Sequence, residues 1–495
     1  MGVMRRQGLK SMLMAYIGVV LGAINVLAVY PACLTPELIG LSGALTDSAM
    51  LLLPTVLLGS TYMGVKFFPN FNNTNKKHNG FLGLLLLIPL FGFAVFALIF
   101  PAIKPLLQSL FIKQSPLFSQ YIVYLLPLLF LFALQWALES WLKSLFLVAI
   151  PSLLRETLWR LLVIAACVLY FYGFVNQHGF VIAYIGCYAI VCLCFVLYVI
   201  GLKKFYWRIN FAQLNKPLVR QMATYSGYII LAGLGVIGMR TIDALMITSM
   251  SGLHSAGVYR IAFFIGTIIE IPYRVFTQIA SPLVASYLSN KNITALDEVY
   301  KKVSINQFIV GLLLLLLIAL NLNTLFKLMP NGQIYAAGWY VVLIIGAAKV
   351  IDSLTSVNNE IIVYSDFYRI SLLIMLSTVA VTIISNLVLI PLYGITGAAI
   401  ASLATITLFN FLKLWFIYYK YKIQPFSKQT VKVLGAALIS AIPAFLIPQL
   451  GHYLLDSTLK TIFLVGIYST LIWKWNISPD INMFLISLMS KIKQR

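Results

Sequence analysis

The sequence predicts an all-α polytopic membrane protein with about fourteen transmembrane helices. Charged residues make up 10% of the 495-residue chain and hydrophobic residues 61%, against about 25% and about 45–50% in soluble domains. Uncharged runs able to hold a spanning helix of about 20 apolar residues recur along the chain, for example at 11–36, 114–138 and 303–326. Lys and Arg, in addition, gather in alternate connections between such runs.

Each predicted helix rests on an apolar stretch long enough to cross a bilayer. Runs 161–202 and 370–412 are about twice the length of one span, and a Tyr-Gly turn signal near the middle divides each into a hairpin. The connections are short and leave no extramembrane domain in which catalysis could take place. The helices are expected near 9–30, 38–65, 80–101, 117–142, 153–172, 179–201, 219–250, 257–289, 303–325, 334–363, 369–391, 394–419, 431–450 and 458–475.

The placement of basic residues predicts the orientation. If the N-terminus is cytoplasmic, 26 Lys and Arg residues lie in the inner connections and termini, beginning with Arg5, Arg6 and Lys10, and only four lie outside. Such a bias follows the positive-inside rule. We therefore expect a bacterial inner-membrane protein with both termini cytoplasmic and a first helix that serves as an uncleaved signal-anchor. The net charge of +22 is explained by topology and by contact with anionic lipid headgroups, so nucleic acid is not expected as a partner.

Cysteine and histidine usage gives no sign of a metal site. The five cysteines lie mostly within spans, where they serve as small apolar packing residues. Cys192 and Cys194 have no His or carboxylate nearby. The four histidines are scattered over different loops. We therefore expect neither a metal nor a cofactor.

Two landmarks recur at nearly the same spacing. Gly173 and Gly394, each preceded by Tyr, are 221 residues apart, and Gly40 and Gly257 in the first outer turn of each half are 217 apart. Glycine-containing hairpins are common in polytopic proteins, but the two offsets agree to within about one helical turn. We therefore interpret helices 1–6 and 7–12 as two copies of a six-helix unit, related by an axis along the membrane normal. The predicted division is an N-lobe at 1–205, a C-lobe at 206–428, and two additional helices with a cytoplasmic tail at 429–495.

Three segments carry a family resemblance. They are Asn386-Leu-Val-Leu-Ile-Pro-Leu-Tyr-Gly-Ile-Thr-Gly-Ala-Ala-Ile-Ala-Ser402, the opening from Arg5-Arg6-Gln-Gly-Leu-Lys10 through Leu34-Thr-Pro-Glu-Leu-Ile-Gly-Leu41, and residues 252–261 with Gly257-Val-Tyr259. They resemble, respectively, the hairpin between helices 11 and 12, the start, and the second-lobe counterpart of that start in polysaccharide-type flippases. These flippases belong to the multidrug/oligosaccharidyl-lipid/polysaccharide (MOP) exporter superfamily. The likeness covers most of the chain, and its motifs are mainly packing and turn residues.

The resemblance implies a substrate and a mechanism. The substrate would be an oligosaccharide on undecaprenyl pyrophosphate, moved from the cytoplasmic to the periplasmic leaflet for O-antigen (lipopolysaccharide), capsule or exopolysaccharide synthesis. The mechanism would be alternating access around a cationic cavity between the lobes. Coupling to Na⁺ or H⁺ occurs in some relatives, and this sequence contains no specific coupling motif. Partners would be membrane lipids and other polysaccharide-assembly proteins.

Ionisable residues inside the predicted helices are the candidate functional residues, because a charge at the membrane centre costs about 2.5–3.5 kcal/mol on insertion scales. The pairs Arg240–Asp243 and Lys349–Asp352 are spaced i,i+3 and Glu270–Arg274 i,i+4, so each pair can neutralise locally on one helix face. The remaining embedded charges are Arg260, Lys413, Asp47, Glu360 and, nearer a helix end, Glu139.

The basic residues suit a diphosphate, which Arg binds through a planar fork and Lys through a point charge. Arg240 and Lys349 are the first choices for binding it because they lie far from their helix ends, followed by Arg274 and Arg260. Arg260 and Lys413 lie near enough to an end to snorkel toward the interface. Asp47 is expected either to bind a coupling cation or to pair with an Arg of the second lobe. The coupling-ion or charge-pair candidates are Asp47, Asp243, Asp352, Glu270 and Glu360.

Two other functions compete with flipping. A drug or cation antiporter of the same superfamily would favour an acidic cavity and usually has twelve helices, whereas acids and bases are balanced here. A membrane glycan polymerase or ligase would need a catalytic acid, base or metal on a large outer loop, and the longest outer segment, near 102–116, has only about fifteen residues. We therefore expect a transporter and no enzyme activity.

Overall fold

The structure is a computed structural model, and it describes residues 14, 16–71, 78–203, 205–209, 214–447 and 452–483. Over these ranges the chain is almost wholly helical and forms no β-strand. Eleven helices within them are long and apolar enough to cross a membrane, which agrees with the predicted all-α membrane fold. The N-terminal basic residues Arg5, Arg6 and Lys10 and the C-terminal tail, used to predict orientation, lie outside the described residues.

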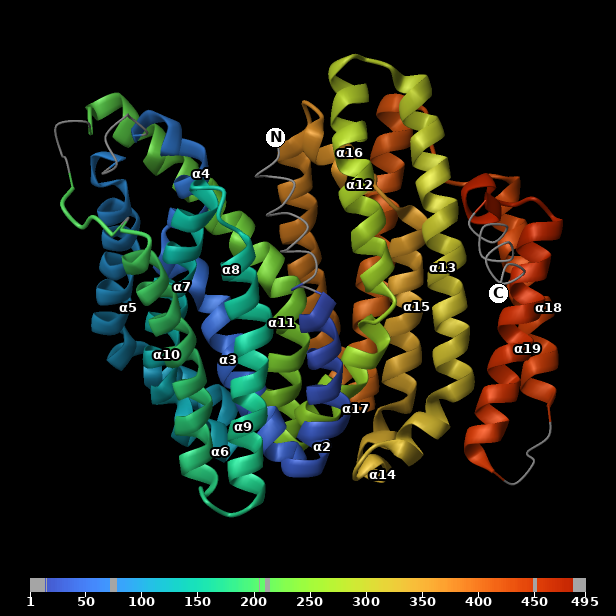
Figure 1. The fold of residues 1–495 in the computed structure, drawn as a ribbon, viewed down its shortest axis with the longest axis horizontal. Helices are drawn as coiled ribbons and strands as arrows, with labels where there is room; N and C mark the ends of the chain where they lie inside the picture. The colour runs from blue at the N-terminus through green and yellow to red at the C-terminus, as the bar shows by residue number, and fades with distance from the viewer. Residues whose placement is uncertain are drawn as a thin grey trace. The chain divides into compact units, whose positions relative to one another are not determined.

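The chain forms two compact units, Met1–Arg260 and Ile261–Arg495 (Figure 1). The first unit contains η1 (Asn25–Val29), α2 (Tyr30–Cys33), α3 (Pro36–Leu57), α4 (Ser60–Phe71), η2 (His78–Gly80), α5 (Phe81–Phe111), α6 (Pro116–Tyr121), η3 (Ile122–Tyr124), α7 (Leu125–Ser144), α8 (Ala149–Ser152), η4 (Leu153–Leu158), α9 (Trp159–Phe171), α10 (Gln177–Gly201) and α11 (Lys216–Thr267) as far as Arg260.

The second unit begins within the last turns of α11. Its further elements are α12 (Glu270–Ser289), α13 (Ile293–Leu328), α14 (Gly332–Tyr335), η6 (Ala336–Gly338), α15 (Trp339–Thr355), α16 (Asn358–Tyr364), α17 (Tyr368–Tyr421), α18 (Lys428–Leu446) and α19 (Tyr453–Lys474). The division into repeats of six helices concerns topology and stays a prediction.

Where the structure describes them, all fourteen predicted spans correspond to helical segments; residues 9–13, 15 and 448–450 of the predicted spans lie outside the described residues. The long helices α11 and α17 each contain one non-helical residue, Gly252 and Gly394 respectively, and therefore provide two spans each. Gly252 has φ 89° and Gly394 φ 57°, a left-handed region that glycine enters without steric cost. The predicted turn at Gly173 is also present, with φ 76°. Both predicted hairpins are therefore confirmed.

Within the described residues, breaks at residues with positive φ interrupt two of the predicted helices. The span expected at 38–65 breaks at Leu58 and Gly59, which both have positive φ. The span expected at 334–363 breaks at Ser356 (φ 54°, ψ −124°), between α15 and α16. Apolar periodicity does not reveal such breaks, because the side chains that accommodate them lie on other helices.

Aromatic side chains dominate the core of the first unit between α4, α5 and α7. Phe71 stacks on Phe81 with ring centroids 4.5 Å apart, and Phe68 meets Trp141 edge to face at 5.8 Å. Aromatic pairs of this kind contribute about 0.5–1.5 kcal/mol beyond the area they bury. The core thereby fixes α7, which carries the buried Glu139, against its neighbours.

The two additional helices of the second unit, α18 and α19, pack on α13. The hydroxyl of Tyr468 donates to the carbonyl of Ile309 at 3.0 Å within an apolar cluster of the three helices. Lys302 Nζ lies 2.9 Å from Asp480 Oδ1, so the start of α13 and the segment after α19 share one end of the unit. The predicted topology places both of these segments on the same side of the membrane.

Candidate functional site

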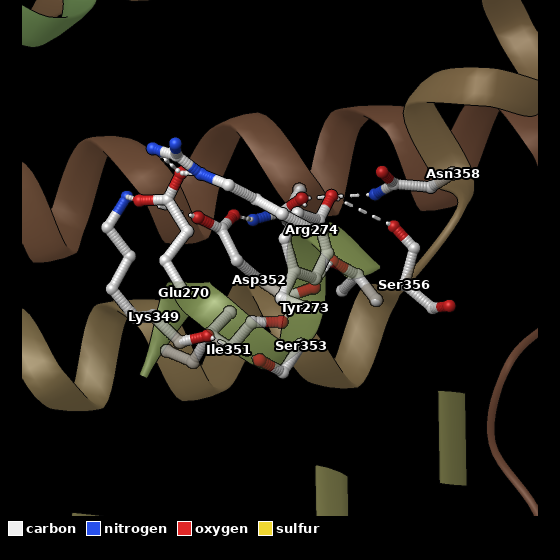
Figure 2. Close-up of polar contacts among 11 residues, drawn as sticks. Glu270, Tyr273, Arg274, Lys349, Ile351, Asp352, Ser353, Ser356 and Asn358 are labelled. Carbon is white, nitrogen blue, oxygen red and sulfur yellow. Dashed lines mark hydrogen bonds and ion pairs between the residues drawn. The ribbon is translucent and has the colours of Figure 1, made fainter. Parts of the chain in front are cut away.

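Charged side chains of α12 and α15 meet in the second unit (Figure 2). Glu270, in the first turn of α12, accepts from Arg274 Nε at 3.0 Å and lies 2.9 Å from Arg274 Nη2. Its other oxygen lies 3.1 Å from Lys349 Nζ on α15. The predicted Glu270–Arg274 pair is confirmed, and Glu270 also joins it to Lys349. The Lys349 and Glu270 side chains are only 16% and 20% exposed.

Asp352 extends this network to α17. Its Oδ2 lies 3.7 Å from Lys349 Nζ, which confirms the predicted i,i+3 pair, and its Oδ1 accepts from Asn410 Nδ2 at 2.6 Å. The Asn410 carbonyl oxygen in turn accepts from Thr355 Oγ1 and Asn358 Nδ2, each at 3.0 Å. Asn410 is buried, so one amide connects α15, α16 and α17. We refer to Glu270, Arg274, Lys349, Asp352 and Asn410 as the unit-2 network.

The helix break at Ser356 lies beside the unit-2 network. Breaking a helix frees backbone carbonyls, and at membrane depth these must be satisfied within the protein. Ser304 Oγ donates to the carbonyl of Leu354 at 2.5 Å, and the Tyr273 hydroxyl donates to that of Ser356 at 3.4 Å. The break is therefore held by α12 and α13. Non-glycine residues with positive φ cost about 1–3 kcal/mol and cluster at functional sites.

Lys413 lies close to the break and is buried, which corrects the expectation that it snorkels. Only 4% of it is exposed. Its Nζ donates to Asn359 Oδ1 at 3.1 Å and lies 3.5 Å from the centroid of the Phe409 ring. An amide and an aromatic face thus hold the ammonium group inside the protein. The side chain therefore does not extend toward the membrane interface. Glu360, on the neighbouring α16, has its Oε2 atom buried without a hydrogen-bond partner in the described part of the chain.

A second charge pair lies in the first unit. Arg260, after the kink of α11, forms an ion pair with Asp47 of α3. The alternative in which Asp47 pairs with an Arg from the second half of the sequence is thereby confirmed. A Cβ on Gly43 would overlap the Arg260 guanidinium, so glycine at this position makes room for the pair. Arg260 Nε is buried and has no hydrogen-bond partner among the residues that the structure describes.

Three further embedded charges of the first unit are Arg240, Asp243 and Glu139. Arg240 is exposed, whereas Asp243 is buried and accepts from the Tyr259 hydroxyl at 3.5 Å. Glu139 is buried at the end of α7 and binds Lys143 Nζ at 2.8 Å and Arg155 Nη1 at 2.7 Å. Asp243 and Glu139 therefore have partners other than Asp47 and Arg260.

These groups offer basic N–H donors that can pass from a protein carboxylate to another anion. Lys349 and Arg260 each face a carboxylate inside a helical bundle, where charges attract more strongly than in water. The Arg274 side chain is 57% exposed. A diphosphate could replace the carboxylate as the acceptor of the same N–H groups. Within the described ranges no group of three or more His, Cys, Asp or Glu residues could hold a metal ion.

Sequence reasoning missed Asn410 and Gly43. The search considered charged residues only, and both of these are neutral. The long uncharged run of α17 contains only two amides, Asn386 and Asn410, and this scarcity is the signal that could have identified Asn410. Gly43 lies 217 positions before Arg260, so aligning the two proposed repeats would have paired it with that arginine.

No known family model matches the chain. In sequence it is 22% identical over 255 residues to an "uncharacterized membrane protein" of Methanocaldococcus jannaschii, covering 51% of this chain and 49% of that protein. The chain thus matches about half the length of this curated relative.

In structure the chain is similar to lipid II flippase MurJ in an inward closed conformation. The TM-score is 0.73 at 12% identity, over 94% of this chain and 99% of MurJ. It is also similar to a multidrug resistance MATE family transporter of the MOP superfamily in an inward-facing conformation, with TM-score 0.64, 14% identity, and coverage of 82% and 98%. A third similar structure is a MOP superfamily transporter from Pyrococcus furiosus described as having a binding pocket of reverse polarity, with TM-score 0.54, 13% identity, and coverage of 85% and 95%. The chain therefore has the multi-pass helical fold of MurJ and MATE transporters.

Proposed function

We propose that this protein is a flippase of the MOP superfamily that moves an undecaprenyl-pyrophosphate-linked oligosaccharide from the cytoplasmic to the periplasmic leaflet. The product would serve surface polysaccharide synthesis, as O-antigen, capsule or exopolysaccharide. The protein would lie in the bacterial inner membrane with both termini cytoplasmic. It would work without a cofactor, by alternating access, alongside other polysaccharide-assembly proteins.

The observation that carries this proposal is a set of basic side chains buried in a fold shared with a lipid II flippase. Lys349 and Arg260 are mostly buried, and each is held by a carboxylate. An unpaired cation in this environment would be costly, and a carboxylate partner keeps the site neutral while it is empty. A diphosphate brings its own negative charge and can take over the N–H donors.

The pairing also suggests how binding could be coupled to conformational change. When a diphosphate binds Lys349, Glu270 keeps Arg274 as a partner, since that pair belongs to the single helix α12. The link between α12 and α15 through Lys349 would weaken at the same time. Substrate binding would thus change the contacts between helices and still leave Glu270 with a cation as its partner. A coupling Na⁺ or H⁺ would act on the same carboxylates.

The proposal is tested in cells that lack the protein. Deletion should cause a lipid-linked oligosaccharide to accumulate on the cytoplasmic face, which mass spectrometry of extracted lipids identifies. Wild type should restore export, and Lys349→Ala and Arg260→Ala should not. The matched control is Lys104→Ala, in the last turns of α5 and in a predicted outer segment. Full export by both site variants and by their double variant would remove these residues from the mechanism.

Similarity to MATE transporters favours one other candidate, an ion-coupled exporter of drugs or organic cations. Asp243, Glu360 and Asp47 would then be the important residues, because cations need acidic partners. Export of an organic dye that survives Lys349→Ala but not Asp47→Asn would favour this function over flipping.

A further inference from the structure

The two turns that suggested an internal repeat lie against each other in the first unit. A Cβ on Gly40 of α3 would overlap the carbonyl of Leu253, and a Cβ on Gly257 would overlap the carbonyl of Pro36. The offsets from Gly40 to Gly257 and from Pro36 to Leu253 are both 217 residues. Gly40 therefore contacts Leu253, which is the repeat equivalent of Pro36. Gly257 contacts Pro36 itself. The contact is reciprocal.

A polar contact obeys the same relation. His254 Nδ1 lies 2.8 Å from Glu37 Oε1, and these residues are also 217 positions apart. Glu37 lies in the first turn of α3, and His254 begins the helical segment after the kink at Gly252. Both side chains are about half exposed. Equivalent positions of the two repeats thus face each other directly, as residues near a twofold axis do.

The pair Gly43 and Arg260 lies one turn farther along the same helices, again 217 residues apart. Side chains at two equivalent positions near the twofold axis of the repeats would compete for the same space. Here the guanidinium of Arg260 fills this space, and Gly43 has no side chain. Asp47, a further turn along α3, neutralises Arg260. The contact surface thus runs from Glu37–His254, past the paired glycines, to the candidate cation Arg260.

We propose that this reciprocal contact is the outer gate of the transporter. The inference rests on the proposed function and on the predicted topology, which puts the start of α3 and the kink of α11 on the outer side. Gly40 and Gly257 let two helix starts approach to backbone distance, which closes the path to Arg260 from outside. Alternating access requires this contact to open once in each cycle, when the two repeats separate.

Crosslinking tests the gate directly. In a background with the five native cysteines replaced, Glu37→Cys and His254→Cys are joined by a short cleavable bis-thiosulfonate reagent in proteoliposomes. Flipping of undecaprenyl diphosphate carrying a fluorescent disaccharide should then fall by at least about tenfold, because a gate that opens in each cycle limits the rate. Reduction of the crosslink should restore it. Each single cysteine variant treated in the same way is the control.

A second set of variants needs no crosslink. Gly40→Ala and Gly257→Ala should impair flipping to a similar extent, because they disturb equivalent halves of one contact. Gly186→Ala on α10, where a Cβ meets nothing within 4 Å, should have no effect.

The outcomes separate the gate from the proposed function. If wild type flips the lipid and the crosslinked protein flips it equally well, the gate is wrong while the function stands. If wild type does not flip the lipid, the proposed function is wrong. The contact itself is then judged by crosslink yield, which needs no substrate, and a yield no higher than that of distant cysteine pairs would overturn it.

Discussion

The ion pair between Lys349 and Glu270 allows a quantitative test of the unit-2 network. At 3.1 Å two unit charges attract by about 5 kcal/mol if the effective dielectric constant is about 20. Desolvation of both groups offsets much of this attraction. Each partner also has a second contact, Arg274 for Glu270 and Asp352 for Lys349. We therefore expect a net coupling energy of about 1–3 kcal/mol between the two side chains.

A double-mutant cycle measures this coupling. The variants Lys349→Met, Glu270→Gln and their combination are unfolded reversibly in mixed detergent micelles, and their free energies of unfolding are compared with wild type. The matched control is the i,i+4 pair Lys301–Asp297 within the single helix α13, for which about 0.3–0.5 kcal/mol is expected. If the effects of Lys349→Met and Glu270→Gln add to within about 0.3–0.5 kcal/mol, the pair does not link α12 to α15 and the reasoning fails.

Three further predictions follow from the same structure. Asn410→Leu removes three hydrogen bonds inside the second unit and should lower the free energy of unfolding by about 2–4 kcal/mol, measured in the same micelles; a loss below about 0.5 kcal/mol would contradict the central place of this amide. Gly394→Ala should lower the free energy of unfolding by only about 1 kcal/mol, through its backbone conformation, because a Cβ there meets nothing within 4 Å. Gly397→Ala should lower it more, because its Cβ would overlap the Leu389 carbonyl. Equal melting temperatures for the two variants would refute this ranking. A periplasmic phosphatase fused after residue 330 should be active and one fused after residue 292 inactive, and the reverse pattern would invert the predicted topology.

Much of the fold was predictable from sequence because the membrane imposes simple rules. Spans must be long and apolar, and basic residues stay on the cytoplasmic side. The turns at Gly173 and Gly394 were predicted because glycine marks positions of positive φ. The break at Ser356 was not, because it depends on Ser304 and Tyr273, which are far away in sequence and satisfy the freed carbonyls.

The candidate site was only partly predictable, for a related reason. Charge pairs within one helix, such as Glu270–Arg274, follow from i,i+4 spacing. The contact from Glu270 to Lys349 joins two helices, and no local pattern contains it. Lys413 shows the opposite failure: its position near a helix end suggested snorkelling, but Asn359 and Phe409 hold it inside. Tertiary partners therefore decide which embedded charges belong together.

The most direct test of the central claim is lipid flipping by the purified protein. Proteoliposomes would contain undecaprenyl diphosphate bearing a fluorescent disaccharide, and a quencher that cannot cross the membrane would report the leaflet in which the sugar lies. The proposal predicts rapid transfer by wild type, a loss of at least about tenfold for Arg260→Ala combined with Lys349→Ala, and wild-type rates for Lys104→Ala. Transfer no faster than in protein-free liposomes, or full activity of the double variant, would contradict it.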